Sequence, residues 1–168
     1  MTSHRIIGPL GAVLLAASLP LRAATLPVEV SFVDPARYTD AGNDPADARA
    51  NEEALARSLR DLGSRYLTSH QSLKIDVLDI DLAGTVRPAA GQISPIRILG
   101  GGADWPRIKL RYALREDGSV VSQGEEVVAD LDYLHAAPVV GAAAPLAYEK
   151  RMLENWFRKR FGASKGNG

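Results

Sequence analysis

The sequence predicts an α+β fold in which two amphipathic helices pack on one face of a mostly antiparallel sheet of about four strands. Residues 45–67 and 145–161 repeat their apolar side chains with the helical period. The segments before and between them alternate apolar and polar residues, as half-buried strands do, and one Asp-Gly pair marks a tight hairpin. The expected order is strand, helix, strand, strand, strand, helix. A doubly wound α/β fold is the alternative, but it needs more helices between its strands.

The beginning of the chain has the pattern of a secretory signal peptide. His4 and Arg5 form a short basic start, residues 6–19 are an apolar run, and small residues follow. We expect residues 1–23 to be this signal peptide, with cleavage after residue 23 or 24. One domain should then cover residues 24–163, followed by a disordered tail at 164–168. The apolar run is shorter than the roughly 20 residues of a transmembrane helix, so we expect a periplasmic protein with no membrane span in the mature chain.

Charge and cysteine content exclude several classes of protein. The chain has 20 Lys and Arg against 20 Asp and Glu, so no overall field attracts nucleic acid or an anionic membrane surface. It has no cysteine, which excludes a lipid-anchored lipoprotein and a disulfide-stabilised domain. We therefore expect an exported domain that its hydrophobic core alone holds together.

The first helix follows a strand and a loop. Residues 28–32 alternate apolar and polar side chains and predict the strand. Asp44 followed by Pro45 is typical of a helix N-cap with proline in the first turn. The helix over residues 45–67 should bury one apolar stripe, which consists of Ala48, Leu55, Leu59, Leu62 and Tyr66.

The second strand carries an irregularity that the sequence makes visible. The alternation of apolar and polar residues slips by one position between Val77 and Leu78, which predicts a β-bulge or a bend there. The following residues 84–104 are rich in glycine and proline, so we expect a loop with at most one short edge strand, in the stretch Pro-Ile-Arg-Ile-Leu at 95–99.

A hairpin follows, and its register decides which charges meet. Residues 107–114 alternate bases with apolar side chains, and Asp117-Gly118 should turn the chain into a return strand within residues 120–133. A two-residue turn places Lys109 opposite Glu126 and Arg111 opposite Gly124, whereas a register shifted by one places Arg111 opposite Glu125. In either register at least one base of this strand is expected to lack an acidic partner.

The last helix has the widest apolar stripe of the chain. Its expected core positions are Met152, Leu153, Trp156, Phe157 and Phe161. Bases crowd its last turn, where the helix dipole favours positive charge. We expect Trp156 to be a core residue, together with Tyr112 of the hairpin.

Several stretches, in this order, resemble a family of secreted bacterial proteins known as domain of unknown function 3016. They are VEVSFVDPARYTDAG, DIDLAG, ADWPRIKLRYAL, SQGEE, DLDYL and YEKRMLENWF. The likeness covers residues 26–161. The resemblance implies export from a Gram-negative type of cell, and it carries over no catalytic residue, cofactor or partner.

The sequence lacks the residue patterns of a metal-dependent or nucleophile-dependent enzyme. His70 and His135 lie far apart, and no third ligand stands at metal-binding spacing. Asp76, Asp79 and Asp81 have the spacing of acids on the solvent face of a strand and lack the glycine and terminal glutamate of a calcium loop. We predict no metal site, no cofactor and no catalytic residue.

Two further patterns have structural interpretations. Glu125 and Glu126 are adjacent on a strand, so their side chains point to opposite faces and cannot act as a carboxylate pair. The glycine-rich stretch at 100–106 precedes a strand, whereas a phosphate-binding loop precedes a helix. Nucleotide binding is therefore not expected.

The candidate binding residues are Trp105, Arg107, Lys109 and Arg111, because the three bases share one side of a strand next to an aromatic residue and a glycine-rich loop. They favour a non-catalytic binding or interaction module of the cell envelope, which takes an envelope protein or a small ligand. The alternative is a periplasmic hydrolase with an acidic site built on Glu125, Asp130 and Asp132. The sequence leaves the oligomeric state open.

Overall fold

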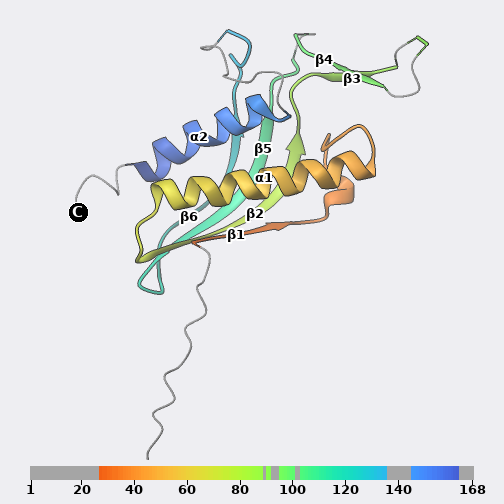
Figure 1. Ribbon diagram of the computed structural model, residues 1–168. Helices are drawn as coiled ribbons and strands as arrows, with labels where there is room; N and C mark the ends of the chain where they lie inside the picture. Colours follow the sequence, from red (N-terminus) through yellow and green to blue (C-terminus); the bar gives the residue numbers. More distant parts are fainter. Residues whose placement is uncertain (1–26, 89, 92–94, 101–102, 136–144, 163–168) are drawn as a thin grey trace, which may run out of the picture.

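The computed structural model describes residues 27–88, 90–91, 95–100, 103–135 and 145–162 (Figure 1). The main elements are β1 (Val28–Phe32), α1 (Pro45–Tyr66), β2 (Gln71–Asp81), β5 (Arg107–Glu116), β6 (Ser119–Ala129) and α2 (Ala147–Phe161). A 3-10 helix, Pro35–Arg37, follows β1, and two short strands, β3 (Thr85–Arg87) and β4 (Ile96–Ile98), lie between β2 and β5. The predicted signal peptide, its cleavage site and the predicted tail lie outside the described residues.

The main sheet has the strand order β1-β2-β5-β6. β1 and β2 are parallel and joined through α1, whereas β2, β5 and β6 are antiparallel neighbours. Figure 1 shows α1 and α2 on the same face of this sheet. The α+β class, the two helices and the mostly antiparallel sheet of four strands are confirmed. We call the sheet face opposite the helices the open face.

The hydrophobic core lies between the helices and the sheet. It includes the whole predicted stripe of α2 and the three leucines of the α1 stripe. Tyr112 and Trp156 both belong to it, as predicted. None of the helices among the described residues is long and apolar enough to cross a membrane.

The ends of both helices follow from local sequence. The Asp44 carboxylate accepts hydrogen bonds from the backbone N–H groups of Ala46 at 2.8 Å and Asp47 at 2.9 Å, which confirms the predicted N-cap of α1. These bonds lower the pKa of Asp44. α2 begins at Ala147, two residues later than predicted, because Leu146 adopts a left-handed conformation with φ of 59° that cannot continue a helix.

The predicted irregularity of β2 is a β-bulge. The register between β2 and β5 shifts between Val77 and Asp79, so Leu78 has no partner on β5. Because of this shift, Val77 and Ile80 are both buried although they are three positions apart, a spacing that would put them on opposite faces of a regular strand. The bulge also places Asp79 and Asp81 beside the bases of β5.

The segment after β2 differs from the prediction. β3 and β4 form a separate two-stranded sheet, so the stretch around Ile96 is not an edge strand of the main sheet. Gly84 explains the departure, because its φ of 87° turns the chain sharply and its N–H donates to the Asp104 carbonyl at 2.9 Å. Arg97 anchors β4 through two bonds to the Asp40 carboxylate, at 2.8 and 2.9 Å.

Candidate binding site on the open face of the sheet

The alternation along β5 puts its bases on the open face. Ile108, Leu110 and Tyr112 are buried under the helices. Lys109 and Arg111 therefore point to the opposite side, and their side chains are about half exposed. The predicted solvent side of this strand is the open face of the sheet.

The hairpin combines both registers that the sequence allows. Asp117 and Gly118 form a two-residue turn with positive φ values of 48° and 85°, which is typical of a type I′ turn. Next to the turn, Arg115 faces Val120 as the first register predicts. A bulge at Val121 then shifts the pairing, so that Arg111 faces Glu125 and not Gly124.

The shifted register, the second of the two alternatives, therefore holds for this part of the hairpin. Lys109 accordingly lies opposite Val127 and not opposite Glu126. The return strand ends at Ala129, four residues before the end of the stretch predicted for it, since the residues after it form turns. The shift leaves Glu125 on the open face and turns Glu126 toward α2, so the two carboxylates do point to opposite faces, as predicted.

Each of the three predicted bases has an acidic partner, which corrects the expectation that one is left unpaired. Lys109 and Arg111 both bind Glu125, at 2.9 and 3.1 Å. Arg107 pairs with Asp81, which belongs to β2. The prediction counted only acids across the hairpin, whereas the other neighbour of β5 supplies acids as well.

Hydrogen bonds favour the charged form of two acids of the open face, Glu125 and Asp76. Those from Lys109 and Arg111 lower the pKa of Glu125. The Ser31 hydroxyl donates to the Asp76 carboxylate at 2.6 Å and is the main cause of the lowered pKa of Asp76, with a smaller contribution from Lys74. On this face, Lys74 is thus paired with Asp76, and Lys109 and Arg111 are paired with Glu125.

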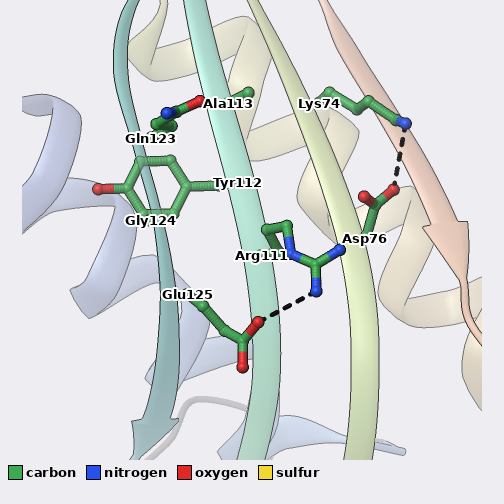
Figure 2. Close-up of a pocket in the computed structure, with 8 residues that line it drawn as sticks. All are labelled: Lys74, Asp76, Arg111, Tyr112, Ala113, Gln123, Gly124 and Glu125. Carbon is green, nitrogen blue, oxygen red and sulfur yellow. Dashed lines mark hydrogen bonds and ion pairs between the residues drawn. The ribbon is translucent and has the colours of Figure 1, made fainter.

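A hollow of about 410 Å³ lies on this face above β2, β5 and β6. We call it the open-face hollow; its lining residues are Lys74, Asp76, Arg111, Tyr112, Ala113, Gln123, Gly124 and Glu125. Figure 2 shows two ion pairs beside it, Lys74 with Asp76 at 3.5 Å and Arg111 with Glu125. Ala113 lies between Lys74 of β2 and Gln123 of β6, and it contributes only a methyl group to the lining of the hollow.

The structure separates the four predicted binding residues. Arg111 lines the hollow, and Lys109 is connected to it through the shared Glu125. Arg107 lies at the start of β5, where its guanidinium is 6.0 Å from the ring centroid of Trp105. Neither Arg107 nor Trp105 lines the hollow. A binding role for these four residues stays a prediction.

Sequence reasoning missed the contributions of β2 and β6 to the hollow. Lys74 and Asp76 occupy the polar positions of β2, and their alternation indicates one shared face. That pattern could have suggested a charged surface. It could not show that β5, which begins 26 positions after the end of β2, lies directly beside β2.

The carboxylates of the alternative acidic site have separate partners. Glu125 binds Lys109 and Arg111, Asp130 pairs with Arg151 at 2.9 Å, and Asp132 contacts His135 at 3.1 Å. Within the described ranges, no group of three or more His, Cys, Asp or Glu residues is arranged to hold a metal ion.

A comparison with protein-family models shows to which family this chain belongs. The family model described as protein of unknown function, DUF3016, matches residues 27–159. The chain belongs to this family. The DUF3016 match runs from the start of β1 into the last turn of α2, so every residue of the open-face hollow lies inside it. No curated protein and no solved structure matches the chain.

Proposed function

We propose that this DUF3016 protein is exported to the periplasm and acts there as a non-catalytic binding module of the cell envelope. The observation that carries the proposal is the open-face hollow, which two ion pairs, Lys74 with Asp76 and Arg111 with Glu125, line beside the small side chain of Ala113. Export is supported by the basic start and the short apolar run at the beginning of the sequence.

The chemistry of the hollow favours binding over catalysis. General acid catalysis needs a carboxyl group whose pKa is raised toward neutrality. The carboxylates of the hollow instead have lowered pKa values, since hydrogen bonds from Ser31 stabilise the charge of Asp76 and those from Lys109 and Arg111 stabilise that of Glu125. They are suited to hold a ligand through charge and hydrogen bonds.

The same pairs indicate what the occupant offers. The hollow presents Lys74 and Arg111 beside Asp76 and Glu125, so neither sign of charge dominates. The positive groups of an occupant with both signs can bind Asp76 and Glu125, while its negative groups bind Lys74 and Arg111. A purely anionic occupant would be repelled by the two carboxylates. The proposed occupant is a segment of an envelope protein, or a small ligand, that carries both signs.

The alternative of a hydrolase built on Glu125, Asp130 and Asp132 has less support. Asp130 is held by Arg151, and Asp132 lies against His135. Since each carboxylate has its own basic partner, their contacts do not join them into one acidic site.

Charge reversal at Arg111 tests the proposal. Arg111→Glu places a third acid beside Asp76 and Glu125, so it should abolish co-purification of the components that the parent retains from an envelope extract. Arg57→Glu is the matched control, because Arg57 also forms an exposed ion pair with a glutamate, Glu53 at 3.6 Å, but on α1. The control should retain the same components.

Folding and export are checked on the same samples. Both variants should show the parent's circular dichroism spectrum, and N-terminal sequencing of the periplasmic protein should begin at residue 24 or 25. Equal sets of co-purified components from all three folded proteins would refute binding at the hollow. An intact Met1 on a membrane-bound product would refute export by cleavage.

A further inference from the structure

We propose that two copies of this chain associate through the outer edges of their β6 strands, which pair antiparallel about Gly124 and join the two sheets into one. This inference concerns self-association and goes beyond the proposed binding function. It rests on three features of β6: a free edge, internally neutralised charges and a self-complementary sequence.

The outer edge of β6 is free within the described part of the chain. β6 is the last strand of the sheet order and pairs only with β5. It has 11 residues and contains no lysine or proline, which commonly protect an edge strand from pairing, and its β-bulge at Val121 lies near the turn, outside residues 123–125. Val121 and Val127 are 55% and 61% exposed. β1, at the opposite edge, has only five residues.

The two acids of β6 do not protect this edge, because partners within the same chain neutralise both. Glu125 binds Lys109 and Arg111. Glu126 accepts a hydrogen bond from Trp156 at 2.9 Å and pairs with Arg160. A second copy therefore approaches a strand with little net charge.

The sequence of β6 is complementary to itself in one register. When an antiparallel pair is centred on Gly124, Gln123 of each copy lies opposite Glu125 of the other, beyond the bulge at Val121. The amide of Gln123 can then donate to the facing carboxylate. At the centre, Gly124 carries no side chain that would crowd the helical layers.

Two neighbouring registers, centred on Glu125 or on Gln123, also place the open faces of both copies on the same side of the joined sheet. Both lack the complementary contacts. A pair centred on Glu125 places the two copies of that carboxylate opposite each other. A pair centred on Gln123 places the two copies of Gln123 opposite each other, so the contact between Gln123 and Glu125 is lost. The register about Gly124 is therefore the favoured one, and it brings the two open-face hollows next to each other because Gln123 and Glu125 line each hollow.

Two substitutions of the exposed Gln123, one to an acid and one to a base, test this register. In the dimer, Gln123→Glu creates two contacts between like charges, and Gln123→Lys creates two between opposite charges, because the pairing is symmetric. Each contact of this kind is worth a fraction of a kcal/mol to about 1 kcal/mol. We expect the dimer dissociation constant to rise roughly tenfold for Gln123→Glu and to fall by a similar factor for Gln123→Lys.

The two substitutions should change the stability of a single copy in the opposite direction from their effect on dimer affinity. An effect on dimerisation can therefore be told apart from an effect on folding. Gln123 lies opposite Ala113, with Arg111 and Arg115 as its diagonal neighbours on β5. A glutamate at 123 is therefore favourable within one copy, and a lysine is not. Thermal unfolding of the monomeric fraction measures this effect independently.

The measurement is sedimentation equilibrium of the chain from residue 24 onward, without added ligand, over a wide concentration range. A parent dimer that Gln123→Glu weakens and Gln123→Lys strengthens supports the proposal. A parent that stays monomeric at every concentration overturns it, and so does a dimer that responds to both variants in the same direction. The readout is the mass of the chain alone, so it is independent of whether the hollow binds a ligand.

Discussion

The indole N–H of Trp156 donates a hydrogen bond to the carboxylate of Glu126 at 2.9 Å, and this bond ties α2 to the edge strand of the sheet. Arg160, one helical turn further on, pairs with the same carboxylate. Beneath them, the rings of Tyr112 and Trp156 meet edge to face, with centroids 5.8 Å apart. One end of α2 is thus attached to β6 by both packing and charge.

Removal of the Trp156 side chain should therefore be costly. Trp156 is buried against Tyr112, Phe157 and Phe161. We expect Trp156→Ala to reduce the free energy of unfolding by about 3–5 kcal/mol, the usual cost of an aromatic truncation in a core. Chemical denaturation measures it. A variant as stable as the parent would show that this face of α2 is not packed on the sheet.

Acid should weaken the same attachment. Burial raises the pKa of Glu126, but the hydrogen bonds from Trp156 and Arg160 outweigh burial and leave this pKa below its ordinary value of 4.5. The folded state therefore favours the charged form, so its contribution to stability is present above pH 4.5 and is lost as the pH falls below it.

A neutral variant isolates this effect. The free energy of unfolding of the parent should decrease as the pH is lowered below 4.5, and that of Glu126→Gln should decrease less steeply. Asp76 keeps its lowered pKa in both proteins, through the hydrogen bond from Ser31, so some pH dependence remains. Denaturant titrations at a series of pH values provide the comparison. Parallel curves would contradict the role of Glu126.

Gly63 should resist replacement although it lies inside a helix. A Cβ atom at this position would lie 2.0 Å from a methyl carbon of Val28, so the glycine allows α1 to approach β1 closely. Helix propensity alone predicts that Gly63→Ala stabilises the protein by up to about 1 kcal/mol. We expect instead a destabilisation of about 1–3 kcal/mol from overpacking, measured by chemical denaturation. A stabilised variant would contradict the close approach.

Most of the architecture could be predicted because local rules and burial agree along this chain. The Asp44 cap and the apolar stripe of α2 follow from side-chain chemistry and periodicity. The bulge at Leu78 is visible in the sequence because one face of β2 stays buried along its length, so the polar positions shift by one residue at the bulge. Such features depend on neighbours in the sequence, which a single chain displays directly.

The remaining features depend on contacts between distant segments. The bulge at Val121 is not marked by any slip in the sequence of β6, since valine and serine fit either face of an edge strand. The separate β3-β4 sheet is fixed by Arg97 on Asp40, residues that are far apart in the chain. The open-face hollow needs β2, β5 and β6 side by side, so no single segment could reveal it.

The central claim, that the open-face hollow is a binding site, is tested most directly by filling it. Ala113→Phe places a large side chain in the hollow, whereas Ala129→Phe places the same side chain at the end of β6, away from the hollow's lining residues. Affinity capture from envelope extract, with quantitative mass spectrometry, compares both variants with the parent. We predict that Ala129→Phe retains the parent's co-purifying components and that Ala113→Phe loses them. Unchanged capture by folded Ala113→Phe would contradict the account.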